Sequence, residues 1–414
     1  MSEQTPKTVR VWVDPNGYMS STLDRVTKED KSVVRVMDVK DSDVGYVDSE
    51  VEHWKDYYFA YDELYDPLQD LPENSLGFWC PFYTKGGSKK RASTMFKFAD
   101  KMFPGLYNVH PLTFNYPEKK VELVSYMKEH KETFFIAKPD DGVCGQDIQL
   151  IHCVEDLETL NPDFEYAIQK YVNNPLLYGK RQRKIDFRVS MTQIMKGGKT
   201  FVYFSESHQG RVAPDPYIPL SSENKDSLET HLTCFQALFD PGYPKYFPTI
   251  DDSTWNDYNN FQHWKNIKKY YEEETDIENF AEEAHKVFKS FAHQTHSIMT
   301  PFTRFFYEIS AADFVARSNT TFMNLWGMDA LLTDNMEPYW LENNLTPSNG
   351  DINESQGLPT PANPAFVSYG RDALSLWIDT ARNKDNFENI KKLGCWEQIV
   401  GPISVDPYEE QSKT

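Results

Sequence analysis

Hydrophobic and polar positions alternate along several short stretches of the chain, and a period of two predicts β-strands. β-branched and aromatic residues fill these stretches, and polar residues bound them. The predicted strands are Val9 to Val13, Phe134 to Ala137, Asp147 to Ile151, Tyr166 to Val172, Lys184 to Met191 and Thr200 to Phe204.

Two other stretches repeat apolar residues at helical spacing, namely Glu118 to Lys131 and Asp276 to Met299. Acidic residues at positions 272–274, 276 and 278 surround the start of the second stretch. We expect this acidic run to open the long helix, because the helix macrodipole favours negative charge at its N-terminus. Strands and helices together predict a mixed fold of the α/β (α+β) class.

The chain has 414 residues, of which 39% are hydrophobic and 14% aromatic, so it can build two or three cores and is not disordered throughout. No run of about 18 apolar residues exists, and the first ten residues carry no apolar segment. We therefore expect no membrane partner, no secretory signal and a cytoplasmic location. The five cysteines are an odd number without a C-x-x-C pair, which argues against a disulfide framework and a zinc ribbon.

The formal net charge of −20 is unevenly spread along the chain. Residues 1–79 hold 8 basic and 17 acidic side chains, whereas residues 80–213 hold 20 basic and 15 acidic ones. An evenly acidic chain would repel nucleic acid, and we expect no nucleic-acid partner. The positive middle third is where an anionic ligand is expected to bind, unless its charge is a chance fluctuation of the surface.

Two apolar runs separated by the turn residues 334–337 predict a β-hairpin late in the chain. If Thr333 pairs with Pro338, Asp329 lies directly across from Glu342. Strict alternation along the second strand then places Trp340 on the same face as Glu342.

The predicted hairpin also brings possible metal ligands together, because Asn344 lies one step beyond Glu342 on the same face. Two opposed carboxylates repel each other, so the pair Asp329 and Glu342 favours a cation between them. Two acids and an amide oxygen are ligands that suit magnesium. The alternative is a register in which both acids merely face water.

The strand that starts at Lys184 alternates strictly, with Lys184, Asp186 and Arg188 on one face and apolar residues on the other. A charged face of this kind suits a site for a charged ligand. It is also typical of an edge strand whose charges only keep it soluble.

Lys138 ends another strand, and a loop with Gly142 and Gly145 follows it. Glycines let backbone N–H groups approach a phosphate closely, and the lysine would add positive charge. An ordinary turn between two strands would look much the same.

Four blocks of sequence combine these features: IAKPDDGVCGQDIQLI at 136–151, AIQKYVNNPLLYGKRQRKIDFRVSM at 167–191, THLTCFQ at 230–236 and LWGMDALLTDNMEPYWLENNLTPS at 325–348. Together and in this order, they resemble the tubulin tyrosine ligase and tubulin tyrosine ligase-like family of ATP-grasp enzymes. The resemblance implies an ATP-grasp architecture with an N-terminal α/β domain at 1–88, a central domain at 89–172 and a C-terminal domain at 173–414 that carries the metal ligands.

The resemblance also implies an ATP- and Mg2+-dependent ligase that joins tyrosine, glutamate or glycine to a protein carboxylate through an acyl phosphate. Its expected partners are tubulin, as the acceptor, and a free amino acid. The residues implied to bind ATP are Lys138, Gln169, Lys170, Tyr171, Val172, Lys184, Asp186, His231 and Thr233. Asp329, Glu342 and Asn344 match the magnesium ligands. Arg188 and Arg211 match catalytic positions that face the reacting carboxylates.

Three positions depart from the family pattern. Cys234 replaces the asparagine of an HLTN motif, Ser205 stands where an arginine is usual, and Arg91 aligns near a lysine. We expect these departures on the substrate side of the site, where they bear on which amino acid is added. They leave open an inactive nucleotide-binding scaffold of the same fold, a ligase for a non-tubulin acceptor, and phosphoryl transfer to a small molecule.

Overall fold

The computed structural model describes residues 9–11, 33–35, 76–77, 88–140 except 106 and 108, 142, 145–233 except 197 and 198, 261–306 except 276, 321–344 and 390–404, with a few isolated positions besides. Cys234 and residues 141, 143 and 144 lie outside the described residues. None of the helices within these ranges is long and apolar enough to cross a membrane.

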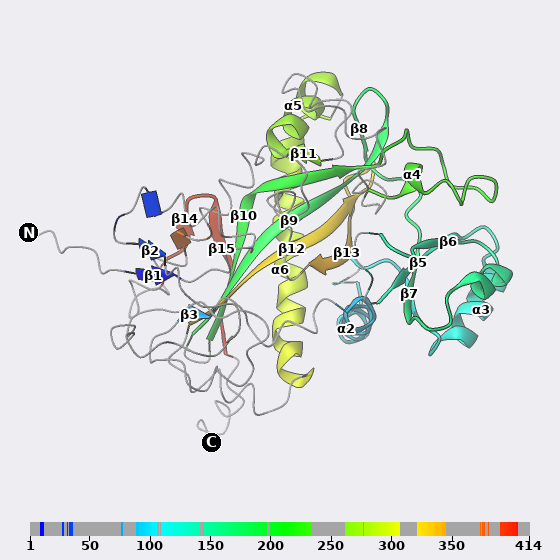
Figure 1. Ribbon diagram of the computed structural model, residues 1–414, viewed down its shortest axis with the longest axis horizontal. Helices are drawn as coiled ribbons and strands as arrows, with labels where there is room; N and C mark the ends of the chain where they lie inside the picture. The colour runs from blue at the N-terminus through cyan, green and yellow to red at the C-terminus, as the bar shows by residue number, and fades with distance from the viewer. Residues whose placement is uncertain are drawn as a thin grey trace, which may run out of the picture.

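The larger sheet of the described chain follows the strand order β13-β12-β9-β10-β15-β14, and the short strands β11, β3 and β8 pair with β10, β12 and β9 (Figure 1). Its strands are β3 (Leu76–Gly77), β8 (Leu177–Tyr178), β9 (Arg183–Lys196), β10 (Lys199–Val212), β11 (Phe261–His263), β12 (Thr321–Leu332), β13 (Pro338–Asn344), β14 (Lys392–Leu393) and β15 (Trp396–Ser404). Neighbouring strands are antiparallel, except that β3 runs parallel to β12.

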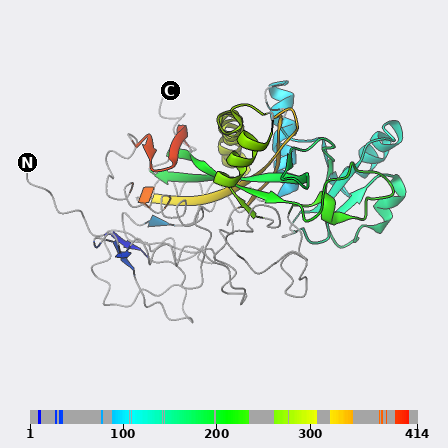
Figure 2. The same cartoon turned by 90° about the horizontal axis from the view of Figure 1, so that it is seen from above.

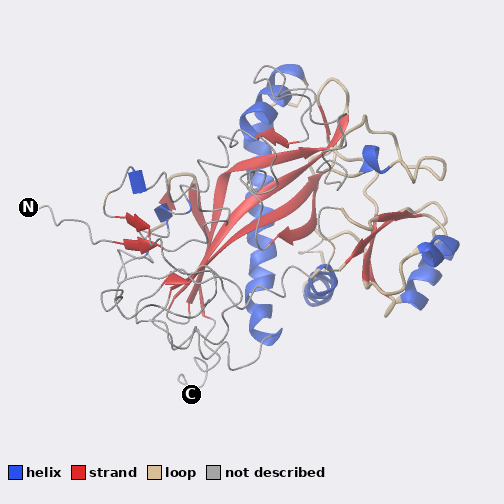
Figure 3. Cartoon of the chain, viewed as in Figure 1, coloured by secondary structure: helices blue, strands red, loops and turns tan. Residues whose placement is uncertain are grey.

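The main core lies between this sheet and the helices α2 (Lys89–Met102), α5 (Trp264–Glu274) and α6 (Phe280–Phe306). The long helix α6 crosses one face of the sheet (Figures 1 and 3). Ile185, Phe187 and Val189 of β9 are all fully buried in this core. The opposite face of β9, with its charged residues, is left for the site.

The smaller sheet has the order β4-β7-β5-β6 and is antiparallel throughout. Its strands are β4 (Thr113–Tyr116), β5 (Phe135–Pro139), β6 (Gln149–Ile151) and β7 (Tyr166–Lys170). The helix α3 (Lys120–Glu129) and the 3-10 helix η4 (Val154–Thr159) cover one face, where Leu123 and Leu157 join its core. Figure 2 shows this smaller layer beside the large sheet.

Three further described elements, named next, lie outside these two sheets. The strands β1 (Val9–Val11) and β2 (Val33–Arg35) form a separate parallel pair. The short helix α4 (Leu228–His231) follows β10.

The predicted mixture of helices and strands is confirmed, but one helix boundary is wrong. Glu272 to Glu274 form the C-terminal end of α5 instead of opening the long helix. A separate helix, α5, precedes the long helix in the chain, because Trp264, Ile267 and Tyr271 are buried at helical spacing. Asn279, in the left-handed region at φ 54°, then precedes α6. The domain ranges 1–88, 89–172 and 173–414 stay a prediction.

Candidate active site

A cleft lies between the two sheets and takes its walls from both. Ile136, Ile148, Tyr171 and Leu232 supply apolar surface. The charged lining residues include Lys89, Lys138, Lys184, Asp186, Arg211, Asp329 and Glu342. A concave site with convergent polar groups beside an apolar wall is typical of a small-molecule pocket.

The hairpin of β12 and β13 sets Asp329 directly across from Glu342, as predicted. The register at the turn is different from the prediction, because Leu332 and not Thr333 pairs with Pro338. If this register continued without interruption, Leu341 and not Glu342 would lie across from Asp329. The register must therefore shift by one residue between the turn and Asp329.

A β-bulge between Asp329 and Ala330 makes this correction, with Leu341 as the extra residue on β13. Because a bulge interrupts the alternation of side chains, Trp340 lies opposite Ala330 and packs in the main core. The prediction that Trp340 shares the face of Glu342 is therefore wrong.

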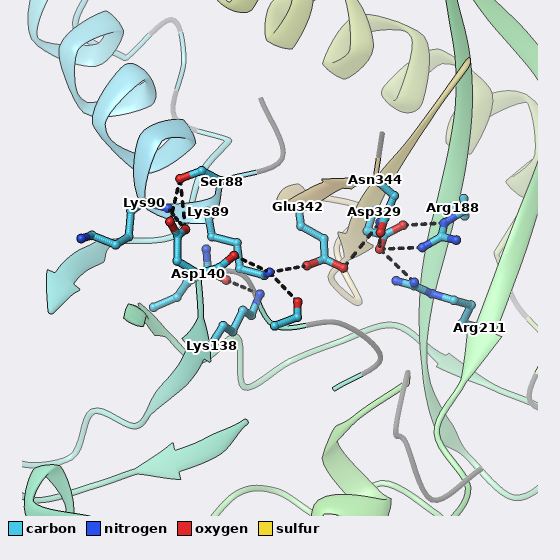
Figure 4. A network of polar contacts seen from close by, with 12 residues as sticks. Ser88, Lys89, Lys90, Lys138, Asp140, Arg188, Arg211, Asp329, Glu342 and Asn344 are labelled. Atoms are coloured by element: carbon cyan, nitrogen blue, oxygen red, sulfur yellow. Dashed lines mark hydrogen bonds and ion pairs between the residues drawn. The ribbon is translucent and has the colours of Figure 1, made fainter. Parts of the chain in front are cut away.

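Asp329 is completely buried and surrounded by cations (Figure 4). Arg188 donates to both of its carboxylate oxygens at 2.9 and 3.1 Å, and Arg211 Nη1 lies 2.8 Å from Oδ2. Burial alone would raise the pKa of Asp329, but the two arginines outweigh burial and lower that pKa to about 2. The repulsion between Asp329 and Glu342 is thus compensated by the protein's own cations, so the register by itself no longer demands a metal ion.

The residues expected to hold Mg2+ nevertheless lie together. Asn344 Nδ2 donates to Asp329 Oδ2 at 2.9 Å and to Glu342 Oε1 at 3.5 Å. An amide that is rotated by half a turn presents its oxygen to the same point. Among the described residues, no group of three or more His, Cys, Asp and Glu side chains could hold a metal. The third ligand here would therefore be the amide of Asn344, together with the carboxylates of Asp329 and Glu342. Two carboxylates and one amide oxygen fit Mg2+, which takes hard oxygen ligands.

Two buried lysines face the cleft from different sheets. Lys138 of β5 donates to Gln169 Oε1 at 2.9 Å, and burial lowers its pKa to about 8. Lys184 of β9 donates to the Tyr171 hydroxyl at 3.2 Å, and burial lowers its pKa to about 7. An anion in the cleft would favour the charged form of both lysines, because opposite charges raise a lysine pKa.

A second ion pair lies beside Asp329. Arg211 holds Asp186 through two hydrogen bonds of 2.8 Å, and the Thr233 hydroxyl donates to the same carboxylate. This order of charges follows from the ladder, because Arg211 pairs with Asp186 and Arg188 pairs with Asp329 across neighbouring strands. Acidic and basic side chains therefore alternate across one face of the sheet.

His231 faces the apolar part of the cleft. Its Nδ1 lies 3.0 Å from the Tyr171 hydroxyl, and its Nε2 is buried with no hydrogen-bond partner among the residues that the structure describes. Burial, with a smaller contribution from Lys184, lowers the pKa of His231 to about 4. The ring is therefore neutral at physiological pH and can offer one nitrogen to a ligand.

Lys89 is a cleft residue that sequence reasoning missed. Its Nζ donates to the carbonyl oxygens of Asp140 at 3.2 Å and Gly142 at 3.0 Å, and it lies 3.5 Å from Glu342. Figure 4 shows it between the loop that follows Lys138 and the hairpin. Ser88 caps α2 and Lys89 is the first residue of that helix, a position that does not by itself indicate a cleft.

The structure brings most of the predicted site residues into this one cleft. The predicted residues that line it are Lys138, Gln169, Lys170, Tyr171, Val172, Lys184, Asp186, Arg211, His231, Thr233, Asp329 and Glu342. Arg188 and Asn344 lie immediately behind Asp329, as their hydrogen bonds show. Lys170 differs from the other lysines in that its side chain is exposed.

Two of the departures lie outside the cleft lining. Ser205 is fully buried opposite Trp396 of β15, outside the cleft lining. Arg91 is exposed, and it does not line the cleft. That these two residues lie beside a substrate stays a prediction, and Cys234 lies outside the described residues.

The chain is similar to several known proteins, each over only a part of its length. Tubulin polyglutamylase TTLL13 of Homo sapiens is 29% identical over 133 residues, which are 32% of this chain and 16% of that protein. Tubulin polyglutamylase ttll-11 of Caenorhabditis elegans is 29% identical over 138 residues, 32% of this chain and 19% of that protein. A probable beta-tubulin polyglutamylase of Tetrahymena thermophila is 25% identical over 223 residues, which are 50% of this chain and 18% of that protein. The matches thus span less than a fifth of each of these relatives.

The match to a protein family covers more of the chain than most of these relatives do. The sequence model of the Tubulin-tyrosine ligase family matches residues 76–355, about two thirds of the chain. This range contains α2, the whole smaller sheet and strands β8 to β13, which together build the cleft. The chain therefore belongs to the tubulin-tyrosine ligase family.

Proposed function

We propose that this chain is an ATP- and Mg2+-dependent ligase of the cytoplasm that joins an amino acid to a carboxylate of tubulin. The observation that carries the proposal is the cleft between two antiparallel sheets, where Lys89, Lys138 and Arg211 converge on Asp329 and Glu342. A site that gathers cations beside hard oxygen ligands is suited to a nucleotide triphosphate with magnesium. The three-domain ATP-grasp architecture belongs to the same proposal.

The two parts of the cleft suggest how ATP would lie. Ile136, Ile148, Tyr171 and Leu232 offer flat apolar contacts for a purine base. The lysines Lys89, Lys138 and Lys184 would neutralise phosphate oxygens. Asp329, Glu342 and Asn344 would hold Mg2+, which would neutralise further phosphate charge.

In this proposal Arg188 and Arg211 both bind Asp329, and Arg211 also acts on the acceptor. They hold Asp329 ionised and in place, which keeps an oxygen ligand ready for the metal. Arg211 also lines the cleft, so its charge would act on the carboxylate of the acceptor as it becomes an acyl phosphate. We propose Arg188 as the support of this arrangement and Arg211 as the catalytic cation.

We propose glutamate as the amino acid that is added, because the relatives in three organisms carry the name polyglutamylase. The family's name leaves tyrosine as a second donor to test. Ser205 lies outside the cleft, so it supplies no argument for an inactive scaffold.

The decisive experiment incubates the protein with purified tubulin, Mg2+-ATP and radiolabelled glutamate, tyrosine or glycine in separate reactions. We expect incorporation of glutamate into tubulin that requires both ATP and Mg2+. The Glu342→Gln variant serves as the matched inactive control.

Other outcomes select the alternatives. ATP binding without incorporation of any amino acid would favour a nucleotide-binding scaffold. Release of ADP without an amino-acid requirement would favour phosphoryl transfer to a small molecule. Incorporation into a protein other than tubulin would keep the ligase and change its acceptor.

A further inference from the structure

Residues 213–233 follow β10 and form a segment that we call the strap. It leaves the large sheet, reaches the edge of the smaller sheet near β6, and returns through α4 to the cleft (Figure 1). Its last residues His231, Leu232 and Thr233 line the cleft. The position of the strap therefore decides the position of one cleft wall.

Apolar contacts join the strap to the smaller sheet. Leu220 and Leu232 of the strap are buried with Phe134, Ile136 and Tyr171, in a cluster separate from the two larger cores. Ile136, Tyr171 and Leu232 also line the cleft. The strap and the smaller sheet thus build the apolar wall jointly.

One ion pair fastens the tip of the strap. Lys225 Nζ is bonded to Asp156 Oδ1 of η4, and the two side chains are only 24% and 13% exposed. The other oxygen of Asp156 accepts the backbone N–H groups of His152 at 2.8 Å and Cys153 at 3.1 Å. The carboxylate is therefore held in a fixed orientation before Lys225 reaches it.

Both partners are charged at neutral pH. Burial alone would raise the pKa of Asp156, but Lys225 and the two N–H groups outweigh it and lower that pKa. The hydrogen bond to Asp156 raises the pKa of Lys225. A charged, partly buried pair in a fixed geometry contributes more than an exposed one.

The ends of the strap are held by other contacts. Asp215 N donates to Glu229 O at 3.1 Å, which closes the strap at its base. The Tyr217 hydroxyl donates to Asn173 O at 2.6 Å. Within the tip, Asn224 Oδ1 accepts from Ser221 N at 2.8 Å and Asn224 Nδ2 donates to Pro219 O at 2.9 Å, so the tip is folded on itself.

We propose that Lys225 and Asp156 are positioning residues for nucleotide binding, because their pair holds the strap tip on the smaller sheet and so holds His231 and Leu232 in the cleft wall. The inference rests on the proposed function in one respect, namely that a nucleotide occupies this cleft. Neither residue lines the cleft, so both act through the strap.

The first test needs no nucleotide. Amide hydrogen exchange of residues 218–226 is expected to be about fivefold faster in Lys225→Met than in the wild type, because loss of the pair favours the detached tip. Lys225→Arg, which keeps the charge, should restore slow exchange. The matched control is Lys289→Met, which removes a 2.6 Å pair with Glu397 on β15, and it should leave the strap unchanged.

The second test measures dissociation of a fluorescent methylanthraniloyl derivative of ATP, bound with Mg2+, by stopped-flow. We expect about fivefold faster dissociation from Lys225→Met, and the wild-type rate from Lys225→Arg and Lys289→Met. Unchanged exchange of the strap, or faster exchange with unchanged dissociation, would overturn the inference. A wild-type protein that binds no ATP would instead overturn the proposed function, and the exchange experiment would still decide whether the pair holds the strap.

Discussion

Asp329 and Glu342 face each other across one hairpin, yet their surroundings assign them different tasks. Asp329 is fully buried and accepts from two arginines. The side chain of Glu342 is 29% exposed and has Lys89 at 3.5 Å as its cation. The Asp329 carboxylate is therefore expected to contribute to stability as well as to ligand binding. The Glu342 carboxylate is expected to contribute to ligand binding alone.

This difference predicts a large loss of stability for one of two similar substitutions and almost none for the other. Asp329→Asn should lower the free energy of unfolding by about 3 kcal/mol, because Arg188 and Arg211 lose the charge of a buried partner. Glu342→Gln should change it by less than about 0.5 kcal/mol, because its surroundings are partly solvated. Urea unfolding at pH 7 measures both.

Both variants are expected to lose ATP-dependent incorporation of glutamate, since each removes a proposed magnesium ligand. If Glu342→Gln kept its activity, the metal assignment would be wrong. Equal loss of stability in the two variants would contradict the distinction between a buried and a half-exposed carboxylate.

At the scale of elements, the strands β9 and β10 extend beyond their predicted ends. Thr192 and Gln193, beyond the predicted end of β9, are polar but buried, and Gln193 Nε2 donates to the Thr200 hydroxyl of β10 at 2.5 Å. Polar residues in these positions hide a strand from a pattern of hydrophobicity. Their hydrogen bonds, which depend on the neighbouring strand, explain why the strand continues.

The hairpin is fixed by a residue that sequence reasoning placed on the wrong face. Trp340 is buried against Phe96 and His110, and its Nε1 donates to Asn343 Oδ1 at 3.2 Å. Its backbone N–H also donates to Val109 O at 2.7 Å. The main core thus holds β13 against α2, which keeps Glu342 beside Lys89.

Trp340→Ala is therefore expected to lower the free energy of unfolding by about 4 kcal/mol, through lost burial and the cavity that remains. Denaturant unfolding followed by circular dichroism measures this. Val121→Ala, at a position that is 84% exposed, should change stability by less than about 0.5 kcal/mol. A small effect of Trp340→Ala would show that the hairpin is held by its ladder alone.

At the scale of the whole molecule, the cleft concentrates positive charge in a chain whose net charge is −20. Lys89, Lys138, Lys184, Arg188 and Arg211 all belong to residues 80–213, the segment with a positive balance. If the proposed acceptor is an acidic segment of tubulin, it is expected to approach along residues 80–213, because residues 1–79 carry a negative balance and would repel it.

Because both sheets line the cleft, ligand binding should stabilise the molecule as a whole. At about a hundredfold excess of Mg2+-ATP over its Kd, linkage predicts a gain of about 2.7 kcal/mol, seen as a higher Tm in calorimetry. Removal of Mg2+ with EDTA should abolish most of this gain. A gain that is equally large in EDTA would contradict the proposed metal ligands.

Much of the site was predictable from the sequence because its residues lie at strand positions whose alternation is regular. The charged face of β9 follows from a period of two along a strand. Asp329 faces Glu342 as predicted, but only because a bulge offsets a turn register that is one residue from the predicted one. Lys89 was not predictable in this way, since it reaches the cleft from a helix N-terminus that is distant in sequence.

The sequence by itself determined the mixed fold, the strand faces and the set of charged residues, because these depend on local periodicity and composition. Only the tertiary structure decided how the charges are compensated, since Arg188, Arg211 and Lys89 meet the hairpin through contacts between distant segments. It also decided the bulge at Leu341 and the attachment of the strap to η4. Such contacts depend on how the sheets pack, and packing is a property of the whole chain that no local pattern contains.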